Sequence, residues 1–568
     1  MPTQARPGRS GPGSVWQSER VTAAELLVRC LENEGVRVVF GIPGEENIRT
    51  TMALDRSPIR YILTRHEQAA SFMAEMYARV TGEAGVVSAT LGPGAINLQL
   101  GVADAHTNST PLVAISAQVG QYRSYKESHQ FVDLVSMFAP ITKWSASVPG
   151  ANAIPEMVRK AFKLAQTERP GAVYLAVPED VDEADADPAL VPLPRNVVRP
   201  EAPSPAQVAR AVEVLRAARC PIVLAGHGAA RAAAGPALAR FAETFGIPVA
   251  TTFHGKGVLA DDHPNAVGTI GFMAHDHVNF GFDDADLILA VGYELEEFDP
   301  VRINPAGDKK IIHIHRFPAE VDAHYSIEVG IEGDIGASLD ALTAAAAGYR
   351  PQHRRLIPSP QLLRDELDRG RADDRFPLAP QRIVADTRAA LGRDDVVLVD
   401  TGAVKMWMAR LYPTYAPGTC LISNGLSTMG FALPGALGVK LAKPDAKVLA
   451  VVGDGAFLMN SQEIETATRE NIPLVVLIWQ DDGYGLIGWK MDLEVGAHSN
   501  VAFTNPDIES YAASFGATGY RIRAVGELLP TLQKALAAGG VSIISCPVDY
   551  RENMKLTERL KKIGEMKR

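Results

Sequence analysis

The segment Val448-Leu-Ala-Val-Val-Gly-Asp-Gly455 joins a short apolar run to a Gly-Asp-Gly turn. After a helical pattern, a second apolar run, Pro473–Ile478, leads into Trp479-Gln-Asp-Asp-Gly-Tyr-Gly485. Apolar runs that alternate with helical patterns predict a parallel sheet covered by helices. Ligands bind such open sheets at the carboxyl ends of the strands. Asp454 and Asp481 are therefore expected to lie close together at one edge of a sheet.

This edge would offer hard oxygen ligands and a backbone that a ligand can approach closely. Asp454 and Asp481 supply carboxylate oxygens and Gly483 a main-chain carbonyl, which are ligand types that Mg²⁺ accepts. Glycine has no Cβ, so a phosphate can come close to the backbone at Gly453 and Gly455. Asp-Gly is also a common turn without any ligand, and that interpretation stays open for the motif taken alone.

The same alternation continues along most of the 568 residues, a length that exceeds what one hydrophobic core usually fills. Strands are expected at residues 36–40, 60–63, 85–88, 112–115, 173–177, 221–225, 287–291, 310–314, 396–399, 448–452, 473–478 and 542–545. The prediction is an α/β chain of three doubly wound parallel-sheet domains, at residues 21–185, 204–346 and 377–550.

Polar, proline-containing stretches separate these units. Residues 180–205 and 350–376 are expected to be linkers. Residues 1–20 are predicted to be a disordered tail. Residues 551–568 are predicted to be a second tail. Within it, residues 554–568 are rich in Lys and Arg at helical spacing, which predicts a solvated terminal helix, with a binding segment as the alternative.

Composition limits the kinds of partner. The formal net charge is −10, whereas proteins that bind nucleic acid or anionic membranes normally present a basic face. No run of about 18 apolar residues occurs, so no membrane span is expected. The four cysteines, Cys30, Cys220, Cys420 and Cys546, show neither CxxC nor zinc-like spacing. We therefore expect a small-molecule partner, no nucleic-acid or membrane partner, and a reducing, cytoplasmic location.

A second motif lies near the other end of the chain. Thr64-Arg-His-Glu-Gln-Ala-Ala70 begins a helix after the expected strand 60–63, with Phe72 and Met76 on its inner face. Taken alone, a glutamate in a first helical turn is usually a surface acid favoured by the helix dipole. This motif up to Gly82, together with the Gly-Asp-Gly turn and a second acid one strand later, resembles the thiamine-diphosphate-dependent enzymes.

Within these enzymes the chain looks most like the acetolactate synthases, in particular the catabolic type, over residues 21–549. The resemblance implies pyrimidine-binding, central and diphosphate-binding domains in that order, with thiamine diphosphate and Mg²⁺ as cofactors. It identifies Glu67 as the catalytic acid that protonates the pyrimidine ring, so that the ring's amino group shifts to an imine and removes the thiazolium C2 proton. Most relatives carry Asn where Asp481 stands, so its charge would tighten metal binding but weaken the attraction for the diphosphate.

The same resemblance assigns further residues to the cofactor. Met429 would be the large apolar residue beneath the bent cofactor, with an ordinary core methionine as the alternative. Gly402 would form a diphosphate-side turn, although the family's Gln-His or Ser-His partners are missing there. Gly92 would bring backbone near the thiazolium, with a plain tight turn as the alternative. Ala456 and Tyr484, which lie within the two metal motifs, would also contact the cofactor.

Substrate contacts are expected from Lys126-Glu-Ser-His-Gln130. Gln130 matches the family's glutamine that faces the substrate, and the Lys126 cation beside an amide would suit a small carboxylate. Ordinary surface-loop residues are the alternative for both. The segment 45–47 differs from the catabolic type and could line the pocket.

The implied reaction is decarboxylation of a 2-oxo acid, pyruvate in the leading interpretation, and transfer of the two-carbon unit to a second 2-oxo acid to give 2-acetolactate. Other decarboxylases, carboligases, acetyltransferases and flavin-linked oxidases share this machinery, and a non-catalytic paralogue is a further alternative. Gly292-Tyr-Glu-Leu-Glu-Glu297 stands where flavin-binding relatives carry an arginine-containing run, so FAD is not expected. Glu67 of one subunit would reach the cofactor held by Asp454 of another, which implies a homodimer or homotetramer.

Overall fold

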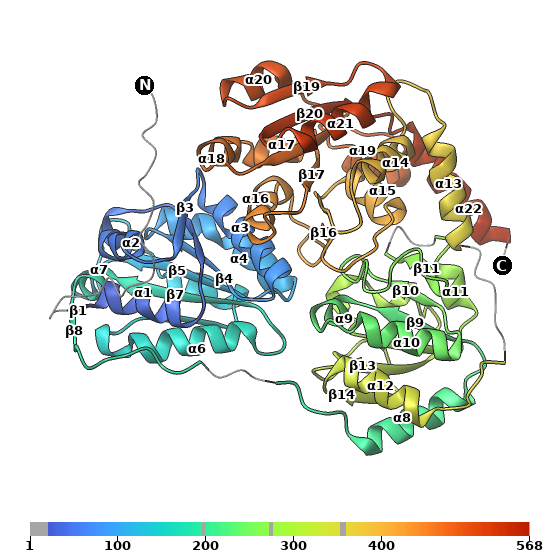
Figure 1. Cartoon of the computed structure of the whole chain (residues 1–568), viewed down its shortest axis with the longest axis horizontal. Helices are drawn as coiled ribbons and strands as arrows, with labels where there is room; N and C mark the ends of the chain where they lie inside the picture. The colour runs from blue at the N-terminus through green and yellow to red at the C-terminus, as the bar shows by residue number, and fades with distance from the viewer. Residues whose placement is uncertain (1–20, 196–198, 272–275, 353–358, 567–568) are drawn as a thin grey trace.

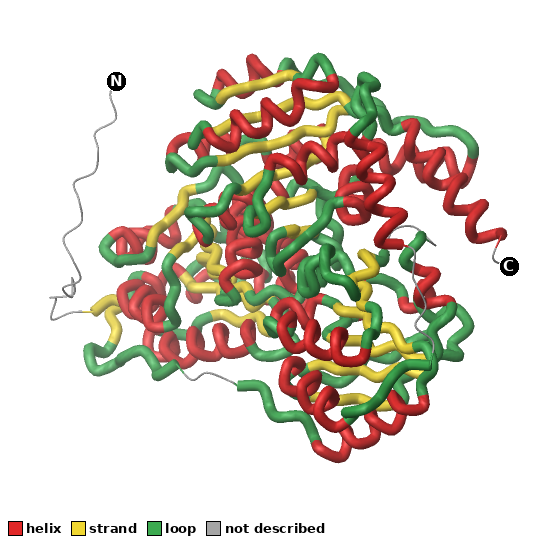
Figure 2. Tube along the Cα trace, turned by 45° about the vertical axis from the view of Figure 1, so that its right-hand side comes forward, coloured by secondary structure: helices red, strands yellow, loops and turns green. Residues whose placement is uncertain are grey.

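The computed structural model describes residues 21–195, 199–271, 276–352 and 359–566, so the predicted tail at residues 1–20 lies outside the described part. The chain forms three six-stranded sheets flanked by helices (Figures 1 and 2). All strand pairs within these sheets are parallel. The predicted fold class, three doubly wound parallel-sheet domains, is confirmed.

The N-terminal domain, blue to teal in Figure 1, has the strand order β3-β2-β4-β5-β7-β6. Its strands are β2 (Val38–Gly41), β3 (Arg60–Leu63), β4 (Gly85–Ala89), β5 (Leu112–Gln118), β6 (Trp144–Ser147) and β7 (Ala172–Pro178). Its helices are α1 (Ala23–Asn33), α2 (Ile48–Asp55), α3 (Glu67–Thr81), α4 (Pro93–Thr107), α5 (Leu134–Phe138), α6 (Ile154–Gln166) and α7 (Glu179–Asp182). An antiparallel pair, β1 (Val21–Thr22) and β8 (Asp185–Ala186), ties its two ends together.

The central domain, green to yellow in Figure 1, has the strand order β11-β10-β9-β12-β13-β14. Counted within the domain this is 3-2-1-4-5-6, the order of dinucleotide-binding folds. Its strands are β9 (Pro221–Ala225), β10 (Val249–Thr251), β11 (Ala266–Thr269), β12 (Leu287–Val291), β13 (Lys310–His315) and β14 (Val329–Glu332). Its helices are α8 (Pro205–Ala217), α9 (His227–Arg231), α10 (Gly235–Phe245), α11 (Asn279–Asp283) and α12 (Ile335–Ala345).

The C-terminal domain, orange to red in Figure 1, has the order β16-β15-β17-β18-β20-β19. Its strands are β15 (Val396–Val399), β16 (Cys420–Ile422), β17 (Val448–Gly453), β18 (Leu474–Gln480), β19 (Thr518–Arg521) and β20 (Val541–Pro547). Its helices are α14 (Pro380–Ala390), α15 (Ala403–Leu411), α16 (Ala432–Ala442), α17 (Asp454–Asn460), α18 (Glu463–Arg469), α19 (Gly485–Val495), α20 (Ile508–Ser514), α21 (Leu528–Ala537) and α22 (Arg551–Met566). Helix α13 (Ser359–Arg371) precedes it.

Every interior strand except β10 falls on a predicted apolar run, whereas five edge strands, β6, β11, β14, β16 and β19, do not. An interior strand of a parallel sheet is buried on both faces and is therefore a continuous apolar run. The edge strands are three or four residues long, and β6, β14 and β19 include exposed residues. Their sequences therefore lack the signal.

Segments expected to be linkers or tails also contain packed structure. α7 and β8 lie within residues 180–205, and α13 lies within 350–376 and packs against α14. The terminal helix α22 buries Leu556 and Leu560, which are one turn apart, in the core of the C-terminal domain. Trp407 Nε1 also donates a hydrogen bond to Asn553 Oδ1 at 2.7 Å. One face of this helix is therefore packed rather than solvated.

The N- and C-terminal domains share one hydrophobic core where α3 crosses α16 (Figure 1). A Cβ added at Gly435 of α16 would lie 2.6 Å from Met76 Cγ, and one at Gly438 would collide with the Met73 carbonyl. These two glycines, about one helical turn apart, therefore allow the close approach of the helices. The helix that begins with Glu67 is thus held firmly against the C-terminal domain.

Candidate active site

Five segments of the C-terminal domain meet in one cavity at the carboxyl ends of β15, β17, β18 and β20. They are the β15–α15 turn, the loop before α16, the start of α17, the β18–α19 turn and the β20–α22 turn. The lining includes all nine cofactor and metal residues predicted in this domain, namely Gly402, Met429, Gly453, Asp454, Gly455, Ala456, Asp481, Gly483 and Tyr484. We call these nine residues the C-terminal cluster.

The two aspartates of this cluster lie at neighbouring strand ends, as their positions in the sequence predict. Asp454 is 2% exposed, and its Oδ2 accepts hydrogen bonds from the N–H groups of Asp482 (2.7 Å) and Asp481 (3.3 Å). Burial raises the pKa of Asp454, and burial together with Asp454 and Asp482 raises the pKa of Asp481 to about 8. A divalent cation would offset both the repulsion and the burial of these carboxylates. The donor set therefore suits such an ion.

Asp400 joins two of the segments that line the cavity. This fully buried residue directly follows β15 and accepts hydrogen bonds from the N–H groups of Gly430 (2.8 Å) and Ala432 (2.9 Å). It thereby ties the turn that carries Gly402 to the loop that carries Met429. Burial raises its pKa to about 6. Its structural role is not among the sequence predictions, although a polar residue directly after an apolar strand is a recognisable signal.

Asn505 is a second residue that the sequence did not mark. Its Nδ2 donates hydrogen bonds to Asp454 Oδ2 and Asp482 Oδ1, both at 2.8 Å. The segment that carries it returns antiparallel to the β18–α19 turn, where Gly483 bridges to Ala502. No motif surrounds Asn505, and only this return brings it to the aspartates.

Glu67 begins α3 in the N-terminal domain and is 8% exposed. Its Oε2 accepts a hydrogen bond from Asn97 Nδ2 at 3.0 Å. A Cβ added at Gly94 would lie 3.1 Å from its Oε1, so the glycine leaves room for the carboxylate. The side chain of the N-cap residue His66 accepts the N–H of Gln68 at 3.1 Å. Glu67 is therefore a buried, oriented carboxyl rather than the surface acid that its helical position alone would suggest.

The predicted turn at Gly92 and the predicted substrate residue Gln130 lie side by side. Gly92 has a φ of +50°, and a Cβ there would lie 2.9 Å from the Gln130 carbonyl oxygen. The segment 45–47 is next to the same turn, since Thr90 Oγ1 donates a hydrogen bond to Glu46 Oε2 at 3.0 Å. With Glu67 beyond Gly94, these residues form a second group. We call Glu67, Gly92 and Gln130 the N-terminal cluster.

The two clusters do not meet within this chain. All residues that line the cavity of the C-terminal cluster belong to the C-terminal domain, so far as the structure describes the chain. Over the same residues, no group of three or more His, Cys, Asp and Glu side chains is arranged to hold a metal ion. The C-terminal cluster offers two carboxylates and a main-chain carbonyl instead, and the remaining ligands of an ion would come from elsewhere.

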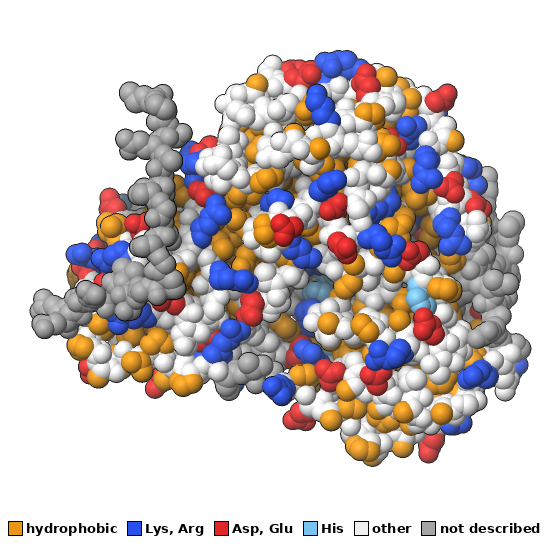
Figure 3. All heavy atoms as spheres, viewed as in Figure 1, with side chains coloured by type: hydrophobic (Ala, Val, Ile, Leu, Met, Phe, Trp, Pro, Cys, Tyr) orange, Lys and Arg blue, Asp and Glu red, His pale blue; other side chains and the backbone are white. Residues whose placement is uncertain are grey.

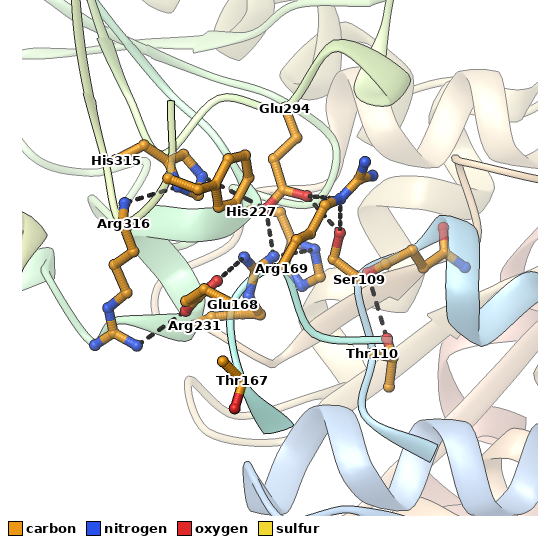
Figure 4. Close-up of polar contacts among 12 residues, drawn as sticks. Ser109, Thr110, Thr167, Glu168, Arg169, His227, Arg231, Glu294, His315 and Arg316 are labelled. Carbon is orange, nitrogen blue, oxygen red and sulfur yellow. Dashed lines mark hydrogen bonds and ion pairs between the residues drawn. The ribbon is translucent and has the colours of Figure 1, made fainter. Parts of the chain in front are cut away.

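A buried polar network joins the N-terminal and central domains away from both clusters (Figure 4). Glu294, 3% exposed, accepts hydrogen bonds from Arg231 (2.5 Å), Ser109 (2.5 Å) and Arg169 (3.2 Å). Burial opposes ionisation, but the Arg231 guanidinium holds the pKa of Glu294 well below its usual range. Arg231 also pairs with Glu168 of the N-terminal domain at 3.4 Å. The network is thus a domain contact built on paired charges.

Three protein families match the chain in succession. They are the thiamine pyrophosphate enzyme N-terminal TPP binding domain over residues 21–137, the central domain over 208–342 and the C-terminal TPP binding domain over 400–546. Each match falls within one of the three sheet domains, and the two TPP binding domains are the ones that carry the two clusters.

Similarity to individual relatives extends over nearly the whole chain. Identity is 35% over 551 residues with acetolactate synthase of Bacillus subtilis, covering 96% of both chains. It is 35% over 543 residues with the catabolic acetolactate synthase of Raoultella terrigena, covering 94% of this chain and 97% of the relative. It is 34% over 549 residues with a probable acetolactate synthase large subunit of Methanocaldococcus jannaschii, covering 94% and 93%. With these matches added to the fold and the cavity, the chain belongs to the thiamine pyrophosphate enzyme family and resembles its acetolactate synthases.

Proposed function

We propose that the chain is an acetolactate synthase, which decarboxylates pyruvate and transfers the two-carbon unit to a second pyruvate. The observation that carries this proposal is the single cavity that gathers the nine residues of the C-terminal cluster. Full-length similarity to proteins named acetolactate synthase supports this reaction over others that use the same cofactor.

The residues of the C-terminal cluster fit a Mg²⁺-bound diphosphate. The Asp454 and Asp481 carboxylates and the Gly483 carbonyl would hold the ion, whose charge would offset the repulsion that helps to raise the pKa of Asp481. A Cβ at Gly453 would meet nothing within 4 Å, so its backbone has open space around it. Met429 would support the cofactor's rings from the cavity wall. When bound, thiamine diphosphate supplies the nucleophilic carbon that adds to the 2-oxo acid and accepts the electron pair left by CO₂.

Glu67 would move the proton that activates the cofactor. Its buried carboxyl would give a proton to the pyrimidine ring nitrogen and take it back later in the cycle. The Asn97 amide fixes one carboxylate oxygen and leaves the other beside Gly94. Such preorganisation means that the acid need not reorient when the proton moves.

Gln130 and Lys126 would contact the substrate. Both side chains are exposed in the single chain, and Gln130 lies against the Gly92 turn of the N-terminal cluster. The Lys126 cation would attract the carboxylate of a 2-oxo acid, and the Gln130 amide could donate to one of its oxygens. Side chains that are exposed in the single chain, but that a second chain would cover, would suit substrate binding.

The complete site would require two copies of the chain. Glu67 and Asp454 lie in separate clusters, and exposed apolar side chains accompany both. On α4, which follows the Gly92 turn, Ile96 and Leu100 are 38% and 39% exposed; on α17, Leu458 and Met459 are 40% and 41% exposed. A second copy that covered both helices would bury these side chains and bring the clusters together. A homodimer is the smallest such assembly, and a homotetramer would contain two.

The central domain would not bind FAD. Its strand order reverses between β9 and β12, which is where dinucleotides bind in this fold. There the Glu297 carboxyl, 3% exposed, accepts the N–H of His227 at 3.0 Å. Burial and the neighbouring Glu294 raise the pKa of Glu297 to about 8. A dinucleotide diphosphate would have to displace these acids, so purified protein should lack flavin absorbance; about one flavin per chain would contradict this.

The surface supports a small-molecule partner rather than a nucleic acid. On the face in Figure 3, Lys and Arg side chains alternate with Asp and Glu and form no continuous basic patch. No helix in the described part of the chain is long and apolar enough to cross a membrane. The four cysteines are free thiols, which suits a reducing cytoplasm.

The direct test is a product assay. Purified protein with thiamine diphosphate and Mg²⁺ should convert pyruvate to CO₂ and 2-acetolactate, which mass spectrometry would identify. A panel of other 2-oxo acids and aldehydes would show whether pyruvate is the preferred donor and acceptor. Acetaldehyde as the main product, or a different acceptor, would replace acetolactate synthesis with another reaction of this cofactor.

A further inference from the structure

An acidic side chain of the C-terminal domain accepts hydrogen bonds from the backbone at the start of α3. Glu463, the first residue of α18, is 0% exposed. Its Oε1 accepts hydrogen bonds from the N–H groups of His66 (3.0 Å) and Arg65 (3.1 Å), and its Oε2 lies 3.2 Å from the Arg65 nitrogen. These two N–H groups immediately precede Glu67. One buried carboxylate therefore holds the backbone from which the proposed catalytic acid extends.

Further contacts dock α18 onto the same segment, and Figure 1 shows this helix beside the end of β3. The Thr466 hydroxyl donates to Glu463 Oε2 at 2.6 Å, which orients the carboxylate. The Arg469 side chain donates to the Leu63 carbonyl. Arg60 pairs with Glu470 at 2.9 Å. The hydrogen bonds between Glu463 and the start of α3 thus lie at the buried centre of a larger contact, whose rim contains ion pairs.

Glu463 is also close in the chain to the C-terminal cluster. α17 begins at Asp454, and α18 follows it after two residues. The ten residues 454–463 thus begin with a proposed metal ligand and end with the carboxyl that holds the start of α3. Within one chain, this is a direct connection between the two clusters that the cavity keeps apart.

We propose that Glu463 is a positioning residue for Glu67, fixing the backbone before it and hence the direction of its carboxylate. This inference rests on the proposed function, because it gives Glu67 a catalytic task. Leaving buried N–H groups without a partner is costly, so the Glu463 carboxyl favours the arrangement in which both are satisfied. Glu463 would therefore restrict the first turn of α3 to one arrangement. A merely structural role would instead stabilise the domain contact without any specific effect on Glu67.

The first test measures how strongly Glu463 holds the N–H groups of residues 65 and 66, in protein without cofactor. In Glu463→Gln, an amide NH₂ would face the N–H donors in place of one carboxylate oxygen. Amide hydrogen exchange of residues 65 and 66 should become about tenfold faster, as expected for the loss of one strong hydrogen bond. Glu494→Gln, an exposed position on α19, is the control and should leave this exchange unchanged. Unchanged exchange in Glu463→Gln would overturn the inference.

The second test asks whether Glu463 acts through Glu67. Glu463→Gln should lower kcat about tenfold or more while KM for pyruvate and the affinity for cofactor and Mg²⁺ change less than about threefold. The double variant with Glu67→Gln should be no slower than Glu67→Gln alone. If Glu463 acts only by placing the Glu67 carboxyl, it has nothing left to affect once that carboxyl is removed. Additive losses would assign Glu463 an independent role and overturn the inference.

The outcomes separate the two proposals. If Glu67→Gln kept near wild-type turnover, the proposed function of Glu67 would fail whatever Glu463 did. If Glu67→Gln were inactive and Glu463→Gln normal, only the positioning inference would fail. Thr466→Val is a milder variant should Glu463→Gln not fold, because it removes only the hydroxyl that orients the carboxylate. It should shift exchange and kcat in the same direction by smaller factors, and no shift in either would count against the inference.

Discussion

The two clusters differ in how much of a site each one completes. The C-terminal cluster lies in a cavity lined by five segments of one domain, with Asp454 buried and held by several hydrogen bonds. The N-terminal cluster has one buried carboxyl, Glu67, beside an exposed Gln130. The proposed metal and diphosphate contacts therefore lie in one domain, whereas the proposed activating acid and substrate contacts lie in the other. The difference teaches that residues predicted for one site can fold into two separate clusters, which is why the proposed site requires a second copy.

The difference does not arise from the fold. Counted within each domain, both sheets have the strand order 2-1-3-4-6-5. Glu67 follows the second strand, at an edge of its sheet, whereas Asp454 follows the third strand, in the interior of its sheet. The same topology thus presents the proposed acid and the proposed metal ligand at different strand ends.

The largest expected effect is that of Glu67→Gln, which removes the transferable proton but keeps size and polarity. Turnover should fall by about 10²–10⁴-fold, the usual range for a general acid–base group. Binding of thiamine diphosphate, followed by calorimetry, should largely survive, and excess cofactor should not restore activity. Glu83→Gln, beyond the other end of α3, is the control. Turnover near wild type in Glu67→Gln would make the acid structural.

Asp454→Ala tests the other cluster and should respond oppositely to added cofactor. Loss of a hard oxygen ligand should weaken Mg²⁺ and with it the diphosphate, so activity should fall steeply at low metal. Activity measured against Mg²⁺ and cofactor concentration should recover in part at high concentrations. Asp492→Asn on α19 serves as the control. An Asp454→Ala protein with unaltered Mg²⁺ dependence would remove the aspartate from the metal site.

Mixing the two inactive variants tests whether the clusters come from different chains. Random reassociation of Glu67→Gln and Asp454→Ala would give one-half hybrid dimers, each with one intact site. Activity should therefore return to about a quarter of wild type after subunit exchange. Each variant taken through the same treatment alone is the control. No recovery, with exchange shown by native mass spectrometry, would place both residues in the same chain's site.

Asn505→Ala should have a moderate effect confined to the C-terminal cluster. Asn505 orients the Asp454 carboxylate and does not itself supply a ligand in the proposed site. Residues of this kind typically contribute 10–100-fold in metal affinity, so a loss of about tenfold is expected by Mg²⁺ titration. Thr504→Ala, its exposed neighbour, should leave Mg²⁺ affinity unchanged. Equal affinities in the two variants would show that the contact does not bear on the metal.

The smallest expected effect is the contribution of Glu463, which holds the start of α3, to the pH dependence of the protein's stability. Burial raises the pKa of Glu463 to about 7, so between about pH 5 and pH 7 the folded state holds a proton that the unfolded state releases. Stability from this group should therefore decrease as pH rises, by at most about 1.4 kcal/mol per pH unit. Wild-type Tm should fall relative to Glu463→Gln over this range, by a few degrees at most. A constant difference in Tm would show that Glu463 is already ionised at pH 5.

The sequence by itself predicted every interior strand of the three sheets except β10, and the family resemblance predicted all nine residues of the C-terminal cluster. Strands such as β9, β12 and β17 are buried on both faces and are therefore continuous apolar runs that need no tertiary information to recognise. Asp454 and Asp481 follow such strands directly, and the carboxyl ends of parallel strands must lie at one edge. The positions of Asp454 and Asp481 in the sequence were therefore enough to predict that the two side chains lie close together.

Only the tertiary structure decided the contacts between segments that no local pattern links. Asn505 contacts Asp454 because its loop folds back onto the β18–α19 turn. Asp400 joins the Gly402 turn to the Met429 loop. Glu463 accepts hydrogen bonds from the start of α3, which belongs to another domain. Sequence patterns report burial and backbone geometry over a few residues. A hydrogen bond between distant segments depends instead on how the sheets and helices pack, and for this reason these positioning residues became visible only in the folded chain.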